Sequence, residues 1–328
     1  MDTTIRSSMV AVITLAMSAA AAACSADDTM TDETEEELAE AEHEITGGTA
    51  ADLWSRARVA SLGNCTAIIV GTRHLLTASH CMPQVGSSAK FYTTTNASYV
   101  PVDDLTSREI QSVAYPPGVN PSTGDYTDSN GKFADIAVIR LTAPIPATST
   151  VATLAWAYPA GGDDFGVKIG QGGHEGGPNA DNDLRGVVDS TYSDNDAEGH
   201  FLTENEQSDL GDSGGPFFYS GRALGVLFGS VFEWEYRNKY SSVQQHLPWI
   251  LTTMSYAFSG TLASGSIVNG TTLSTPYASS SRECSYICDK TSSCVAFNFT
   301  PVTPWTPCTL KSTNTGSAAM GGATSGVK

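Results

Sequence analysis

Short apolar segments that alternate with turn-forming residues run through the middle of the chain. Each segment has the length of a strand, is rich in Val and Ile, and is bounded by Gly, Asn, Asp or Pro. This pattern is typical of an all-β barrel or sandwich. The segments are CTAIIVG, HLLTASH, IAVIRL, VKIGQG, LRGVVDSTY and ALGVLFGSVF. After them, Val243, Leu247, Ile250, Leu251 and Met254 follow helical spacing, so one amphipathic helix is expected to close this region near Ser255.

The composition shifts to Gly, Ser and Thr from Phe258 onward. The segment SSSRECSYICDKT predicts a capped helix with Cys284 and Cys288 one turn apart on one face. Two short strands, CVAFNF and PCTLKS, are expected after it. A unit of about 70 residues buries little core, so disulfides are expected to stabilise it.

The charge of the chain is concentrated near its start. The formal net charge is −18, and residues 25–44 hold ten acidic residues and no Lys or Arg. From Ile45 onward there are 24 acidic and 16 basic residues, a net charge of −8. Residues 25–44 are therefore expected to form a disordered or marginally helical acidic propeptide, and nucleic acid is not expected as a partner.

Residues 1–24 have the features of an export signal. Arg6 precedes the stretch MVAVITLAMSAAAAAC, which is too short and too alanine-rich for a membrane span. The end of this stretch resembles a bacterial lipobox, with Cys24 as the candidate lipidated residue, although Ala21 stands where a larger aliphatic side chain is usual. An ordinary A-x-A cleavage is the alternative. Both interpretations predict a secreted or cell-envelope protein, with a membrane contact only through the lipid.

Six further cysteines follow, an even number that indicates disulfides in an exported chain. They are Cys65, Cys81, Cys284, Cys288, Cys294 and Cys308. No CxxC pair is present and the four late cysteines lack companion histidines. Neither a metal nor a cofactor is expected.

The stretch QSDLGDSGGP, residues 207–216, has the composition of a nucleophile loop. Glycines around Ser213 let the backbone approach a carbonyl closely, whereas Ser208 lacks such neighbours. A serine nucleophile needs a base and a group that orients the base. His80 and Asp135, each at the end of an expected strand, supply these two groups in the chain order His, Asp, Ser.

In this order, TASHC, DIAVIRL and GDSGGP, together with ITGG, resemble the chymotrypsin-like (trypsin-fold) serine peptidases over residues 45–257. The resemblance implies two six-stranded antiparallel β-barrels with a C-terminal helix, and a peptide or protein substrate. It implies that Ser213 attacks the carbonyl, that His80 moves the proton and that Asp135 holds the imidazole. The N–H groups of Gly211 and Ser213 would form the oxyanion hole. It also implies a Cys65–Cys81 disulfide.

The primary specificity pocket departs from the family pattern. Gln207 occupies the floor position where trypsins have Asp, so cleavage after Arg or Lys is not implied. Asp209 replaces a common cysteine. The wall aligns either as Phe228-Gly229-Ser230 or, with one deletion, as 227–229, and neither alignment keeps the family serine.

Activation by cleavage is a further implication of the resemblance. EHEITGG predicts a cut after Glu44, after which the α-ammonium of Ile45 would pair with the buried carboxylate of Asp212. The family usually has Arg or Lys before the cut. Because Glu44 stands here, a glutamate-specific or broad protease is the expected activator.

Residues 258–328 resemble a PAN/apple-type module, an α+β unit, through CSYIC, CVAFNF, CTLK and SGVK. The resemblance implies the pairs Cys284–Cys308 and Cys288–Cys294 and a protein or carbohydrate ligand. A structural cap on the barrel is the alternative for the module. For the whole chain, the alternative to a serine endopeptidase is a catalytically inactive, protease-fold adhesion protein.

Overall fold

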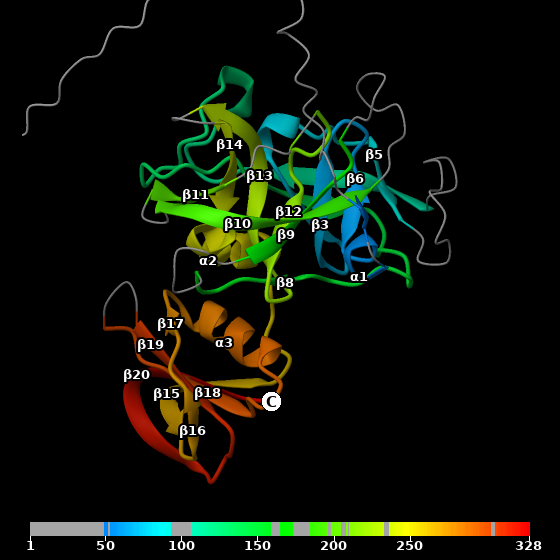
Figure 1. Cartoon of the computed structure of the whole chain (residues 1–328). Coiled ribbons are helices and arrows are strands. Elements are labelled where there is room, and N and C mark those ends of the chain that lie inside the picture. The colour runs from blue at the N-terminus through cyan, green and yellow to red at the C-terminus, as the bar shows by residue number, and fades with distance from the viewer. Residues whose placement is uncertain are drawn as a thin grey trace, which may run out of the picture. The chain divides into compact units, whose positions relative to one another are not determined.

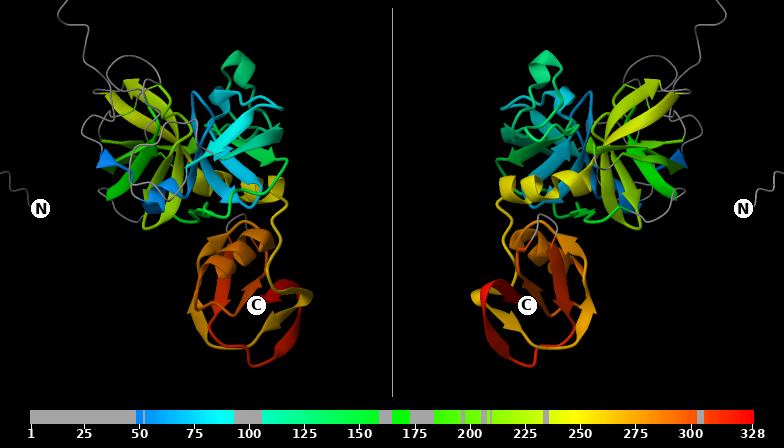
Figure 2. Two further views of the ribbon diagram at one scale, coloured as in Figure 1. Left: turned by 90° about the vertical axis from the view of Figure 1, so that its right-hand side faces the viewer. Right: turned by 90° about the vertical axis from the view of Figure 1, so that its left-hand side faces the viewer.

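The computed structural model describes most of the chain after the acidic segment (Figures 1 and 2). The described residues are 49–51, 53–92, 106–158, 165–172, 184–195, 198–204, 208, 210–232, 236–302 and 306–328. Among them, no helix has the length and apolar composition needed to cross a membrane. The predicted signal peptide, Cys24, the acidic propeptide and Ile45 lie outside the described residues.

The first barrel is a closed ring of six antiparallel strands, in the order β2-β3-β4-β7-β6-β5. The strands are β2 (Val59–Ser61), β3 (Thr66–Gly71), β4 (His74–Thr77), β5 (Ser88–Phe91), β6 (Thr106–Ala114) and β7 (Ala137–Leu141). Their branched and aromatic side chains, such as Ile69, Phe91 and Ile139, fill the interior. The Val- and Ile-rich segments form strands here because closing the ring buries them and leaves no open edge.

The second barrel is also a ring of six antiparallel strands, in the order β10-β11-β14-β13-β12-β9, closed by the pairing of β9 with β10. The strands are β9 (Phe165–Gly170), β10 (Arg185–Asn195), β11 (His200–Thr203), β12 (Pro216–Tyr219), β13 (Arg222–Phe232) and β14 (Tyr236–Ser242). Two short strands add to this ring, β1 (Thr49–Ala50) on β10 and β8 (Thr153–Leu154), parallel, on β13. In the interior, the rings of Phe201 and Tyr240 stack at 5.1 Å between centroids. The prediction of two six-stranded barrels is therefore confirmed.

Within the described residues, four helical segments accompany the barrels. They are α1 (Leu53–Arg56), η1 (Ser79–Cys81), η3 (Pro121–Thr123) and α2 (Val243–Thr253). The helix α2, the yellow coil in Figure 2, packs against β13 and β8. Its buried face includes Val243, Leu247, Ile250 and Leu251, so the spacing in the sequence predicted the correct face.

In its described residues, the C-terminal unit has a six-stranded antiparallel sheet and one helix, α3 (Ser281–Lys290). The strands are β15 (Thr261–Val268), β16 (Thr272–Ser274), β17 (Tyr277–Ala278), β18 (Ala296–Phe299), β19 (Thr306–Lys311) and β20 (Ser317–Val327). Figure 1 shows β15 and β20 side by side. The helix begins where the Ser280 hydroxyl accepts a hydrogen bond from the N–H of Glu283. Disulfides join Cys284 to Cys308 and Cys288 to Cys294, the two predicted pairs.

Candidate active site

Two neighbouring strands of the first barrel bring His80 and Asp135 together. β4 pairs with β7 so that Thr77 faces Ala137. His80 follows β4 in η1 and Asp135 precedes β7. Because the two strands are antiparallel, both residues lie at the same end of the strand pair. His80 Nδ1 lies 2.6 Å from Asp135 Oδ2, and the carboxylate is completely buried. This contact fixes the orientation of the imidazole and leaves its Nε2 side for other partners.

Ser79 is a part of this group that the sequence analysis missed. Its hydroxyl is fully buried and donates a hydrogen bond to Asp135 Oδ1 at 2.5 Å. The N–H of His80 donates to the same oxygen at 2.8 Å. Asp135 therefore accepts three hydrogen bonds, which together hold a buried charge in one orientation. A polar residue directly before His80 in TASHC was the only signal for this role in the sequence.

The loop around Ser213, residues 210–215, precedes β12 and is hydrogen-bonded to both barrels. The N–H of Thr66 donates to the Ser213 carbonyl at 2.8 Å, and the N–H of Gly214 donates to the Leu227 carbonyl at 2.8 Å. Gly214 has φ +81°, and a side-chain carbon placed on it would lie 2.1 Å from Thr77 Oγ1. Only glycine fits there, and this close approach places Ser213 next to the end of β4 and thus beside His80.

The hydroxyl and two N–H groups of this loop are placed for chemistry on a carbonyl. Ser213 Oγ is partly exposed and lies 3.4 Å from the Phe228 carbonyl oxygen. Gly211 has φ +108°, and its carbonyl is held by the Thr66 hydroxyl at 2.9 Å. Within the described part of the chain, neither the N–H of Gly211 nor that of Ser213 donates a hydrogen bond to the protein. These two N–H groups can therefore donate hydrogen bonds to a developing oxyanion.

Aromatic rings surround the imidazole. The ring of Phe228 packs edge-on against His80 at 5.5 Å and against Tyr126 at 5.8 Å, between ring centroids. Burial, and to a smaller extent the negative charge of Asp135, raises the pKa of the Tyr126 hydroxyl, so the phenol stays neutral beside the carboxylate. Phe228, expected in the specificity pocket, thus contributes its carbonyl to Ser213 and its ring to His80.

The structure describes only some residues of the predicted specificity pocket. Phe228 forms a bulge in the pairing of β13 with β14, and Gly229 follows it with φ +148°. Ser230 Oγ contacts Ser208 Oγ and the Asn238 side chain. Gln207 and Asp209 lie outside the described residues.

Asp212 is buried directly before Ser213. Its Oδ1 accepts a hydrogen bond from the N–H of Gly172 at 2.6 Å. A side-chain carbon placed on Gly170 would lie 1.9 Å from the same oxygen. Two glycines therefore make the space in which this carboxylate lies, and a larger residue at Gly170 would displace it.

Cys65 and Cys81 lie close to His80, and their Sγ atoms together with a ring nitrogen fall within 4.8 Å of one another. The two sulfur atoms are 2.05 Å apart and form the predicted disulfide. A metal needs the thiolate form of cysteine, so this bonded pair does not supply ligands. The disulfide instead links Cys65, directly before β3, to the segment that holds His80.

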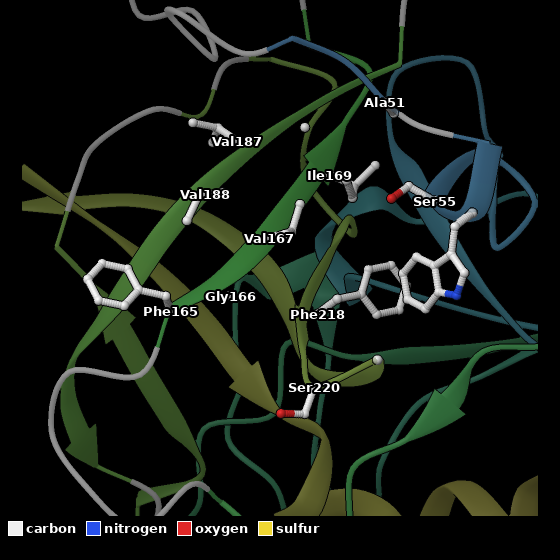
Figure 3. A pocket seen from close by; sticks show the side chains of 13 residues that line it. Ala51, Ser55, Phe165, Gly166, Val167, Ile169, Val187, Val188, Phe218 and Ser220 are labelled. Atoms are coloured by element: carbon white, nitrogen blue, oxygen red, sulfur yellow. The ribbon is translucent and has the colours of Figure 1, made fainter.

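An open pocket of about 650 Å³ lies on the outer side of the second barrel, between α1 and the strands β9, β10 and β12 (Figure 3). Its wall includes Trp54 of α1, Val167 of β9, Val188 of β10 and Phe218 of β12, and the lining contains neither His80, Asp135 nor Ser213. It is therefore separate from the candidate active site.

A His–Asp pair on one barrel, beside a serine loop attached to both barrels, defines a protein of the two-barrel serine protease fold. Residues 45–250 match the family model described as Trypsin, and residues 261–326 match the model described as PAN domain. The chain therefore belongs to the trypsin family and carries a PAN domain after its protease-fold domain.

Two solved structures illustrate the likeness, which at these identities concerns the fold alone. Neuropsin, a serine protease expressed in the limbic system of mouse brain, is 21% identical with a TM-score of 0.52, and the match covers 63% of this chain and 99% of that chain. Human heparin binding protein is 17% identical with a TM-score of 0.50, covering 66% and 99%. No curated protein matches the chain at a significant level.

Proposed function

We propose that the protein is a serine endopeptidase in which Ser213 attacks the scissile carbonyl and His80 takes and returns the proton. The observation that carries this proposal is the buried Asp135 carboxylate, 2.6 Å from His80 Nδ1, next to a glycine-rich serine loop. Asp135 orients the imidazole and stabilises its positive charge during the reaction. The N–H groups of Gly211 and Ser213 bind the oxyanion of the tetrahedral intermediate.

Activation by cleavage is the second part of the proposal. A cut after Glu44 creates an α-ammonium on Ile45, and Asp212 offers it a buried carboxylate one residue before the nucleophile. The hydrogen bond from the N–H of Gly172 already holds that carboxylate in the space that Gly170 and Gly172 leave open. Pairing with the ammonium would stabilise the conformation of Gly211 and Ser213 that binds the oxyanion.

Export and binding complete the proposal. The signal features of residues 1–24 and the disulfides fit a secreted or cell-envelope enzyme, with Cys24 as its candidate lipid anchor. The PAN domain would bind a protein or a carbohydrate and bring the protease domain to its substrate.

One observation is compatible with the alternative, a binding protein with an inactive protease fold. Ser213 Oγ contacts the Phe228 carbonyl at 3.4 Å, and no hydrogen bond joins it to His80, both of which are described residues. A hydroxyl rotates freely about its bond, and catalytic contacts often tighten only with substrate bound. The contact is thus compatible with an enzyme as well.

Hydrolysis of an unlabelled protein substrate by purified, processed protein tests the proposal, with His80→Ala and Ser213→Ala as variants. Both variants should keep the melting temperature of the wild type and lose activity, because the triad acts as one unit. Turnover above about one thousandth of wild type in either variant would overturn the assignment, since oxyanion binding alone accounts for less.

A further inference from the structure

The outer face of the second barrel carries apolar side chains where an antiparallel sheet usually presents polar ones to water. A side-chain carbon placed on Gly166 would lie 2.4 Å from the ring of Phe217 in the barrel interior, so Gly166 faces inward. Because side chains alternate along a strand, Phe165, Val167 and Ile169 of β9 point outward. All three line the open pocket of about 650 Å³, here named the outer pocket.

The outer pocket has a buried floor and an exposed rim (Figure 3). Trp54 packs edge-on against Phe218 at 5.0 Å between ring centroids and covers this part of the floor. At the rim, Phe165 is 70% exposed and Val188 of β10 is 63% exposed. Val188 pairs with Val167, and Figure 3 shows both side chains on the pocket wall. An apolar pocket whose rim is this exposed is typical of a surface that binds another molecule.

A second pocket, of about 320 Å³, adjoins the outer pocket at Ser220, which lines both. It is named the arginine pocket here, because Arg222 lines it together with Tyr158 and Tyr219. The Arg222 guanidinium lies 3.6 Å from the centroid of the Trp156 ring. Burial lowers the pKa of Arg222, so its positive charge is partly removed from water and an anion beside it would be stabilised.

The charge of these two pockets is positive. Within the part of the chain that the structure describes, Arg222 has no carboxylate partner, and the lining of the two pockets contains no Asp or Glu. A second guanidinium, that of Arg58, lies over the ring of Trp54 at 4.0 Å. The chain from Ile45 onward has a net charge of −8, so this surface differs from the protein as a whole. It therefore complements a partner that carries an anionic group beside an apolar one.

The turn between β12 and β13 separates the two pockets. Its residues, Ser220 and Gly221, are exposed, and among the described residues their N–H groups donate no hydrogen bond to the protein. A fatty acid would need one continuous apolar channel, which this polar turn interrupts. In an extended peptide, by contrast, side chains two residues apart point to the same side with a spacing of about 6.6 Å, so each can enter one pocket. The N–H groups of the turn can then donate to peptide carbonyls between them.

We propose that the two pockets form a docking surface for an extended segment of another protein, which places an apolar residue in the outer pocket and an acidic residue, two positions away, at Arg222. A Phe or Leu side chain covers the exposed rim of the outer pocket. The acidic side chain pairs with the guanidinium, which stays stacked on Trp156. No residue of the proposed triad lines either pocket, so this binding does not depend on peptide cleavage.

Fluorescence anisotropy with a fluorescein-labelled Gly-Ser-Phe-Ser-Glu-Ser-Gly peptide tests the proposal. The full chain carries Ser213→Ala, so that the peptide cannot be cut. The peptide should bind saturably, and replacing its Phe with Ser or its Glu with Lys should weaken binding by about tenfold or more. Absence of saturable binding, or equal affinities of the Glu and Lys peptides, would overturn the proposal.

Charge reversal on the protein tests the role of Arg222. In Arg222→Glu, the Lys peptide should bind more tightly than the Glu peptide, by about threefold or more, and this inverted preference also shows that the variant is folded. The matched control is Arg140→Glu, at an exposed position of β7 in the first barrel, which should keep the wild-type preference. An Arg222→Glu variant that still prefers the Glu peptide, or a control that inverts as well, would refute the assignment.

The rim is tested by Val188→Ser, which should weaken the Glu and Lys peptides alike, by about threefold or more, because both place Phe in the outer pocket. Val85→Ser, at a valine that is 66% exposed in the first barrel, should leave both affinities unchanged. Equal effects of the two substitutions would contradict the placement of the apolar residue.

A second copy of the chain is the competing occupant of this surface, and sedimentation velocity distinguishes it. A monomer that binds the peptide supports the proposal. Self-association that Arg222→Glu abolishes, in a protein that binds no peptide, would overturn it in favour of a dimer.

Discussion

Removing the Ser79 hydroxyl should reduce catalysis without changing substrate binding. Ser79→Ala deletes the 2.5 Å hydrogen bond to Asp135 Oδ1 and leaves the two bonds from His80. A hydrogen bond to a charged group contributes about 1.5–3 kcal/mol. If all of this stabilisation is needed when the imidazole becomes charged in the transition state, kcat/KM should fall by about 10- to 150-fold. Ser79 is fully buried and cannot touch substrate, so KM should not change.

Steady-state hydrolysis of one small peptide, with kcat and KM resolved separately, is the assay. The matched control is Ser61→Ala in β2, which removes another fully buried hydroxyl of the same barrel, one that accepts a hydrogen bond from Gly63 and contacts no triad residue. Ser79→Thr keeps the hydroxyl and should recover kcat in part. The reasoning would be refuted if Ser79→Ala kept kcat within twofold of wild type, or if Ser61→Ala lost as much.

Three further predictions concern other parts of the chain. Asp212→Asn should be cut before Ile45, as N-terminal sequencing would show, and yet be nearly inactive; full activity in protein that still carries residues 25–44 would contradict the activation mechanism. Gly214→Ala should cost about 2 kcal/mol and lower the melting temperature by about 4–8 °C, because its side chain would overlap Thr77 Oγ1 and strain the backbone, whereas Gly86→Ala, at φ +85° with no atom within 4 Å, should lower it less. Burial raises the pKa of Glu283, so the folded state binds its proton more tightly than the unfolded state. The melting temperature of the wild type minus that of Glu283→Gln should therefore fall as pH rises from 4.5 towards 7, and parallel pH profiles would rule this out.

Six of the twelve barrel strands could be predicted from local sequence because closure of the barrels buries their Val- and Ile-rich side chains, whereas the arrangement as two barrels followed only from the resemblance to the serine peptidases. The segments IAVIRL and ALGVLFGSVF became β7 and β13, and the amphipathic spacing after Val243 became α2. In the C-terminal unit, the sequence predicted α3, β18 and β19 but missed β15 and β20. The strand β20 reads SAAMGGATSGV, and its first six residues are exposed, so no alternation of apolar and polar residues marks it. It is a strand because β15 and β18 supply its hydrogen-bond partners.

His80, Asp135 and Ser213, the proposed triad, could be selected from the sequence because each lies in a short motif. The role of Ser79 could not, because it depends on a partner 56 residues away that only folding brings near. The two alignments of the wall segment also remained open in the sequence. The structure shows why, since Phe228 forms a bulge that breaks the regular register of β13.

Covalent labelling by a fluorophosphonate, followed by peptide mapping, tests the proposed catalytic serine most directly. The reagent reacts only with a serine that a neighbouring base activates and an oxyanion hole supports. Processed wild-type protein should carry one adduct on Ser213, and Ser213→Ala and His80→Ala should carry none. A wild-type protein that begins at Ile45, is fully folded and takes up no label would contradict the enzyme and support the binding protein.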